Sequence, residues 1–214
     1  MLCSRVAVMF VATMLVSSVA GRDAVWVGSA TAQVSESPSA APGLGRPKVH
    51  RVAGDVYAVT DLYHSAGGKS GVNAGIIFTK GNVVFIDAGM SIASGEYLWN
   101  LAREKMKGNE KIFLILTHHH SDHVFGMRVF KDRGATVLTH PAVADSLRGD
   151  KGQYKAFIAK ASGWTERQAD EILGEVILSV PDRLLEQDVT LDIGGRPIRI
   201  LVTPGHVPDA LCVY

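Results

Sequence analysis

The chain has 214 residues, of which 47% are hydrophobic and 20% are charged, and its formal net charge is +1. This composition is ordinary for a globular protein, and the sequence has no basic stripe of the kind that binds nucleic acids. A net charge so close to zero also gives no long-range steering of a charged partner.

The N-terminal residues 1–20 have the pattern of a secretory signal. Arg5 precedes an apolar run over residues 6–20, which is too short for a comfortable membrane span. Two cleavage sites fit the small-x-small rule, one after Ala20 and one after Ala32, and the sequence does not decide between them. We expect a periplasmic or secreted protein with no stable membrane span after cleavage. An uncleaved N-terminal anchor is the alternative.

Short strands and helices alternate through the middle of the chain. Residues 33–47, rich in Ser, Pro, Ala and Gly, predict a flexible leader before them. Strands are predicted at about 49–53, 55–60, 73–79, 82–87, 111–117 and 135–139. Helices are predicted over 91–107 and 124–133. This alternation indicates α/β organisation.

The stretch over residues 141–176 is predicted to be mostly helical, with a capping box at Thr165-Glu166-Arg167-Gln168. It either packs over the functional site as a lid or forms an ordinary outer layer. The apolar residues that would do this are Phe157, Ile158, Trp164, Ile172 and Leu173. Two strands are predicted after it, at roughly 184–193 and 197–203.

Side chains able to bind a metal follow the strand predicted over 111–117. They are His118, His120, Asp122 and His123. In an extended segment residues i and i+2 point to the same side, so the imidazoles of His118 and His120 face one point. The chain then turns, and Asp122 and His123 can face a second point close by. Three imidazoles and a carboxylate suit zinc better than calcium or magnesium.

Further candidates lie at the ends of two other predicted strands. His206 follows a Pro-Gly turn in Thr203-Pro204-Gly205-His206, and the first cluster makes it a candidate ligand. Asp87 ends an apolar strand, where it either hydrogen-bonds the second nitrogen of a ligand imidazole or caps a turn. His119 lies between two candidate ligands and is expected to point away from them. His64, in the loop after the second predicted strand, is a weaker candidate to overhang the site.

These motifs together resemble the metallo-β-lactamase superfamily of dinuclear zinc hydrolases. The shared features are H-x-H-x-D-H after a buried strand, T-P-G-H after a later strand, and Phe85-Ile86-Asp87-Ala88-Gly89. The resemblance covers residues 48–214 and implies an α/β fold, a four-layer αββα sandwich with the metal site at a sheet edge. It also implies hydrolysis by a metal-bound hydroxide.

The resemblance also implies a division of the ligands between two zinc ions. His118, His120 and His206 would hold the first ion, and Asp122 and His123 the second. Asp122 would orient the hydroxide and pass a proton to the leaving group. Members of the superfamily continue with a second half that carries a last His ligand and often a bridging Asp. We therefore expect 48–214 to be a fragment of a longer domain, with the second half incomplete.

The expected function is an exported zinc-dependent hydrolase that attacks a small carboxylic-acid derivative: an ester, thioester, lactone or amide. A β-lactamase is the alternative, although Asp209-Ala210 replaces the Gly-Ser more usual after T-P-G-H-x-P. An inactive metal-binding relative is the alternative of another class. Cys212, the only thiol once Cys3 leaves with the signal, is predicted to be a core residue and not a ligand. The oligomeric state stays open.

Overall fold

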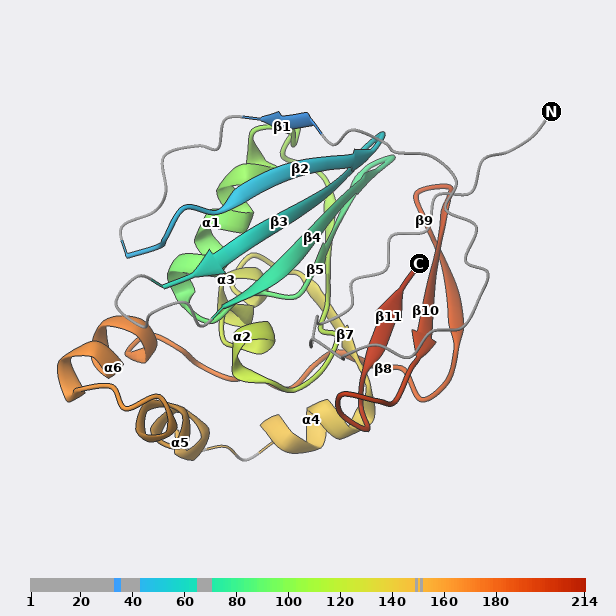
Figure 1. Cartoon of the computed structure of the whole chain (residues 1–214). Coiled ribbons are helices and arrows are strands. Elements are labelled where there is room, and N and C mark those ends of the chain that lie inside the picture. Colours follow the sequence, from blue (N-terminus) through green and yellow to red (C-terminus); the bar gives the residue numbers. More distant parts are fainter. Residues whose placement is uncertain (1–32, 36–42, 65–70, 149, 151) are drawn as a thin grey trace, which may run out of the picture.

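The computed structural model describes residues 33–35, 43–64, 71–148, 150 and 152–214, which form two β-sheets with helices around them (Figure 1). The predicted secretory signal, residues 1–32, lies outside the described residues, as do residues 36–42 of the predicted leader. Within the described part of the chain, no helix has the length and apolar character needed to cross a membrane.

The larger sheet contains eight strands whose order in space follows their order in the chain. They are β1 (Gln33–Ser35), β2 (Lys48–Ala53), β3 (Val56–Tyr63), β4 (Gly71–Thr79), β5 (Asn82–Ile86), β6 (Lys111–Ile115), β7 (Thr136–Thr139) and β8 (Arg183–Leu184). The strands from β1 to β5 pair antiparallel, and those from β5 to β8 pair parallel. The parallel strands therefore end at one common edge of the sheet, and the loops that follow β5, β6 and β7 meet there.

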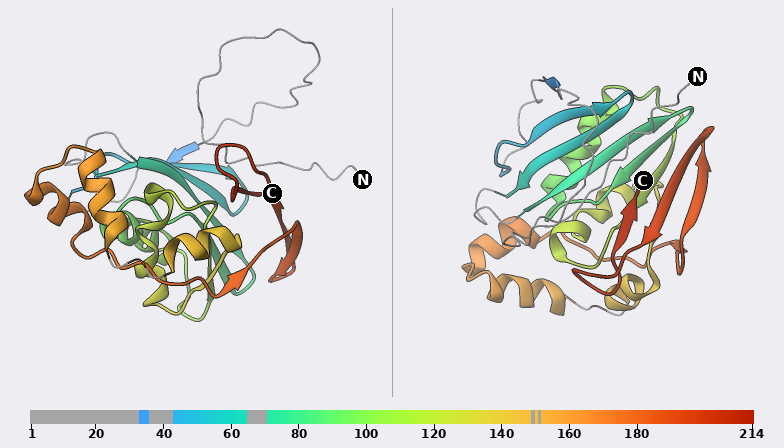
Figure 2. Two further views of the ribbon diagram at one scale, coloured as in Figure 1. Left: turned by 90° about the horizontal axis from the view of Figure 1, so that it is seen from below. Right: turned by 45° about the vertical axis from the view of Figure 1, so that its right-hand side comes forward.

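The smaller sheet has three antiparallel strands in the order β11-β10-β9. They are β9 (Val189–Ile193), β10 (Arg196–Val202) and β11 (Leu211–Val213). Apolar residues of this sheet, including Ile198 and Ile200, pack against Ile115 and Leu138 of the larger sheet. The two sheets thus lie face to face with a hydrophobic layer between them (Figure 2).

Helices cover the opposite face of the larger sheet. The elements are α1 (Ile92–Arg103), α2 (Ser121–Val124), α3 (Met127–Lys131), α4 (Pro141–Leu147), α5 (Gln153–Ala161) and α6 (Glu166–Leu173). Strand β5 is buried along its whole length, because Phe85 faces the helical layer while Val84 and Ile86 face the smaller sheet. Burial on both faces explains why this strand is apolar at nearly every position.

The α/β sandwich expected from the sequence is confirmed, with a helical layer, a large sheet and a small sheet in contact. Among the described residues, no helix lies outside the small sheet (Figure 2).

Three boundaries differ from the sequence prediction. The helix predicted over 91–107 ends at Arg103, and the chain turns where Glu110 accepts the backbone N–H groups of Lys107 and Gly108. The single helix predicted over 124–133 is divided into α2 and α3 at Gly126, whose N–H donates to the Gly89 carbonyl. The strand predicted over 184–193 is two strands, β8 and β9, which belong to different sheets.

The predicted flexible leader is partly folded onto the larger sheet. Strand β1 pairs with β2, and Leu44 is buried and forms a β-bridge with His64. The low complexity of residues 33–47 hid these contacts, because sheet pairing uses backbone groups that every residue carries.

Candidate metal centre

The first two histidines of the motif lie at the carboxyl end of β6, at the edge where the parallel strands end. His118 is buried, and His120 is the residue directly before α2, in extended conformation. Nε2 of His118 lies 3.2 Å from Nδ1 of His120. The alternation expected of an extended segment thus places both imidazoles on one side of the chain.

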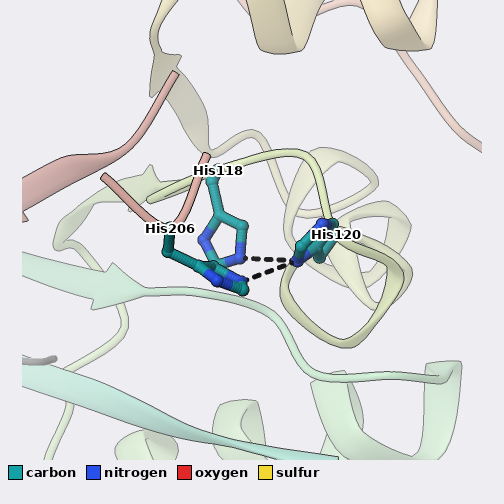
Figure 3. A group of neighbouring side chains, drawn as sticks. All are labelled: His118, His120 and His206. Atoms are coloured by element: carbon teal, nitrogen blue, oxygen red, sulfur yellow. Dashed lines mark hydrogen bonds between the residues drawn. The ribbon is translucent and has the colours of Figure 1, made fainter. Parts of the chain in front are cut away.

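The third histidine reaches this pair from the smaller sheet. His206 lies in the loop between β10 and β11, and its Nε2 is 3.1 Å from Nδ1 of His120. One nitrogen from each of His118, His120 and His206 lies within 4.8 Å of the other two (Figure 3). The convergence predicted from the sequence is present, across 86 positions of the chain.

The chemistry of this donor set fits a zinc ion. Burial, with a smaller contribution from the neighbouring His123, lowers the pKa of His118 to about 3. Burial also lowers the pKa of His120. Both imidazoles are therefore neutral at pH 7, the form that offers a lone pair to a metal. Three imidazoles facing one point also leave a fourth tetrahedral position open.

The two other predicted ligands lie beside this group at the first turn of α2. Oδ2 of Asp122 is 3.7 Å from Nε2 of His123, and the rings of His118 and His123 have centroids 3.9 Å apart. The structure thus brings all five predicted residues to one place, and His118, His120 and His206 each direct one nitrogen to a common point.

Asp87 supports the site from the end of β5. Its Oδ2 lies 2.8 Å from Nδ1 of His123, and its Oδ1 accepts the backbone N–H of Thr117 at 2.8 Å. Burial lowers the pKa of His123, but the Asp87 carboxylate outweighs it, so the net pKa is raised. Asp87 has φ 62°, a left-handed conformation that Asp tolerates better than most residues. The predicted contact between this carboxylate and a ligand imidazole is therefore present.

Thr117 was not singled out in the sequence, although it joins three of these groups. Its Oγ1 lies 2.8 Å from Oδ2 of Asp87, 3.0 Å from Nδ1 of His118 and 3.3 Å from Nδ1 of His123. The hydroxyl thus holds the second nitrogens of two candidate ligands on the same side of the cluster.

Asp209 is the second residue that sequence reasoning missed as part of the site. It is 2% exposed, and its Oδ2 lies 2.8 Å from Nδ1 of His119, the histidine expected to point away from the ligands. The sequence carries one sign of this residue: Asp209-Ala210 replaces the Gly-Ser pair that is more usual after T-P-G-H-x-P.

The helical segment over 141–176 is mainly an outer layer. Ile172 and Leu173 join the core on the helical face of the large sheet, while Phe157 is 63% exposed. One side chain of this segment does reach the site: Tyr154 donates its hydroxyl to the His119 carbonyl at 3.1 Å. Burial, and then the charge of Asp122, raises the pKa of this phenol to about 12, so it is a neutral donor at pH 7.

Three other side chains of types that can bind a metal, His64, His140 and Cys212, lie elsewhere. His64 is buried against the turn at Gly43, and His140 caps α4 by accepting the Ala142 N–H. Cys212 is half-buried in β11 opposite Leu201, and burial raises the pKa of its thiol. None of these three side chains belongs to the group of converging imidazoles.

A family model described as the metallo-beta-lactamase superfamily matches residues 67–214. Curated relatives include an acyl-coenzyme A thioesterase MBLAC2 from Homo sapiens and another from Bos taurus, each 25% identical over 181 residues. Each match covers 77% of this chain and 61% of the relative. The chain therefore spans about three fifths of the length of these relatives.

Solved structures with the same fold include the MIM-2 metallo-beta-lactamase, with a TM-score of 0.53 and 25% sequence identity. That match covers 77% of this chain and 55% of the other. A metallo-beta-lactamase from Pontibacter korlensis has a TM-score of 0.53 at 23% identity, covering 78% of this chain and 66% of that one. A double mutant of the sec-alkyl sulfatase PisA1 has a TM-score of 0.56 at 12% sequence identity, and that match covers 78% of this chain and 29% of the other.

Proposed function

This chain belongs to the metallo-beta-lactamase superfamily, and from that membership we propose that the protein is a zinc-dependent hydrolase of a carboxylic-acid derivative. The observation that carries the proposal is the convergence of His118, His120 and His206 within 4.8 Å. Three imidazole nitrogens that converge on one point, with one ring buried and a second partly buried, are arranged as they would be around a metal.

In this proposal His118, His120 and His206 hold one zinc ion, and Asp122 with His123 takes part in holding a second. Zinc supplies Lewis acidity and lowers the pKa of water to about 7. Asp122 orients the attacking water and passes its proton to the leaving group. Its carboxylate is about one-third exposed beside His123, so a substrate can reach it.

The residues beneath the ligands hold this arrangement in place. Asp87 fixes the ring of His123, and the Thr117 hydroxyl fixes that of His118. Such partners keep a ligand nitrogen directed at the metal and keep the proton on the far nitrogen.

A thioester is the first substrate class to test, because the curated relatives are named as acyl-coenzyme A thioesterases. A β-lactam is the second candidate, because the similar MIM-2 structure is named as a metallo-beta-lactamase. We also propose that the protein is exported, to the periplasm or beyond, on the strength of Arg5 and the apolar run after it.

The test combines metal analysis with a substrate panel. The purified protein is assayed for bound zinc, and then for hydrolysis of an acyl-coenzyme A thioester, an aryl ester, a lactone and a chromogenic cephalosporin. We expect bound zinc, and turnover of the thioester that is lost on chelation and restored by zinc. Faster turnover of the cephalosporin would favour the β-lactamase instead. Zinc without turnover of any substrate would indicate an inactive metal-binding relative, and a protein that binds no zinc would overturn the proposal.

A further inference from the structure

Asp209 is a buried carboxylate whose hydrogen bonds go to a single residue 90 positions away. Its Oδ2 lies 2.8 Å from Nδ1 of His119 and accepts the His119 backbone N–H at 3.2 Å. A carboxylate that is 2% exposed is costly to bury unless such bonds compensate for the lost water. The two bonds therefore keep the segment around His119 close to Asp209.

The position of His119 gives these bonds their effect on the site. His119 stands between His118 and His120, the two histidines supplied by the large sheet. Because Asp209 holds both the ring and the backbone amide of His119, it fixes the peptide that joins the two candidate ligands. On the other side, the Tyr154 hydroxyl binds the carbonyl of the same residue. His119 is thus held at three atoms while its neighbours face the metal position.

The loop that carries His206 has much weaker support of its own. Thr203, Pro204, Gly205 and His206 are all exposed. The chain closes this loop with the Thr203 N–H donating to the Ala210 carbonyl at 2.8 Å. Besides the contact between His206 and His120, the loop meets the segment of the histidine pair through Asp209 and through the Leu211 N–H, which donates to the Thr117 carbonyl at 2.8 Å. These two contacts with the large-sheet segment help to hold the exposed histidine beside the pair.

From these contacts we infer that Asp209 is a positioning residue for the metal centre. Its carboxylate fastens the loop of His206 to the segment of His118 and His120, so that the three imidazoles meet before a metal arrives. The inference rests on the proposed function, because it assumes that these imidazoles bind zinc. Zinc affinity then depends on the Asp209 carboxylate, although Asp209 is not itself a ligand.

The test measures zinc affinity directly, by competition with a chromophoric chelator, in the wild type, Asp209→Asn and Asp209→Ala. Loss of a carboxylate that orients a ligand typically costs 10–100-fold in metal affinity, and we expect a loss of about that size for Asp209→Ala. Asp209→Asn keeps the shape of the side chain and one acceptor oxygen, so its zinc affinity should lie between that of the wild type and that of Asp209→Ala. The absorption spectrum of the Co²⁺-substituted protein reports in parallel on the geometry of the ligands.

Asp182→Asn is the matched control. Asp182 accepts the Val137 backbone N–H at 2.7 Å and pairs with the Lys131 ammonium at 2.6 Å, away from the histidines. Its loss should lower the melting temperature of the metal-free protein and leave zinc affinity unchanged. If Asp209 had a purely structural role, Asp209→Ala would likewise lower the melting temperature and leave zinc affinity unchanged.

A double-mutant cycle separates action through His119 from a general effect. If Asp209 acts through that residue, Asp209→Ala combined with His119→Ala should bind zinc about as well as Asp209→Ala alone. A measurable loss in His119→Ala that adds in full to the loss in Asp209→Ala would overturn the inference. Unchanged zinc affinity in Asp209→Ala, with a wild type that binds zinc tightly, would overturn it while leaving the proposed function intact. A wild type that binds no zinc would overturn both.

Discussion

At the scale of single residues, the site separates into side chains that face the metal position and side chains that hold them. The first group was visible in the sequence, because His118 and His120 alternate on an extended segment and His206 follows a turn. Asp87 could be predicted as a supporting residue because it lies at the end of a strand. Thr117 and Asp209 could not, because only the folded chain brings them to their partners, and Thr and Asp are common residues in turns.

Removing one imidazole tests the first group. His118→Ala should lower zinc affinity by more than about 100-fold, beyond the 10–100-fold typical of a lost supporting residue. Most of the hydrolytic activity should disappear with the metal. The measurement is zinc content after dialysis, together with the rate on the best substrate. His50→Ala, which removes a histidine bonded only to Thr60 on the surface of β2 and β3, is the control and should behave as wild type. A His118→Ala variant that keeps both zinc and activity would contradict the assignment.

At the scale of elements, strands and helices were predicted closely where apolar periodicity was strong. Strands β4 and β5 pair as a hairpin through Lys80 and Gly81, at the break between the strands predicted over 73–79 and 82–87. The prediction was wrong where tertiary contacts, rather than apolar periodicity, determine where a helix or strand ends. Gly126 divides the helix predicted over 124–133, because the chain there packs so tightly that a Cβ would lie 2.0 Å from the Ala88 carbonyl oxygen. The strand predicted over 184–193 divides because β8 pairs with β7, while β9 pairs with β10.

Asp182 links three elements, and its contribution to stability should depend on pH. Burial raises the pKa of its carboxyl, but the hydrogen bonds from Lys131 and Val137 outweigh this, so the net pKa lies below the ordinary value of an Asp. A group whose pKa is lowered by folding stabilises the folded state above its unfolded pKa and loses that effect as the pH falls through the folded value. Asp182→Asn should therefore be less stable than the wild type at pH 7, by about 1 kcal/mol for a partly exposed pair.

The two proteins should converge in stability as the pH falls below about 4, the range in which a free Asp becomes protonated. Urea unfolding of the metal-free proteins at several pH values gives the comparison. A difference that persists unchanged into acid would show that the charge of Asp182 does not contribute.

At the scale of the whole molecule, the candidate metal centre lies where the two sheets meet. His118 and His120 follow β6 of the large sheet, Asp122 and His123 lie in α2 directly after them, and His206 comes from the loop between β10 and β11 of the small sheet. The sequence predicted the fold class and this meeting point through its likeness to a known family. It did not reveal that β1 and Leu44 pack onto the large sheet, since their surroundings resemble a linker in composition.

A metal held by both sheets should stabilise the entire fold. At a free zinc concentration 100 times the dissociation constant, a ligand that binds only the folded state adds about 2.7 kcal/mol to the free energy of unfolding. We therefore expect zinc to raise the melting temperature of the wild type. The shift should shrink in His206→Ala, which leaves the large-sheet ligands in place. An equal shift in both proteins would show that zinc binds elsewhere.

The sequential order of strands in the large sheet has a consequence for biosynthesis. From β2 to β5, each strand pairs with the strand just before it in the chain, so these contacts are local and should form early during folding. The segment with His118 and His120 leaves the ribosome well before His206. A nascent chain thus presents a half-built, low-affinity site first. Tight binding of zinc then requires the small sheet, so it is expected only after the chain has been made through His206 and both sheets have folded.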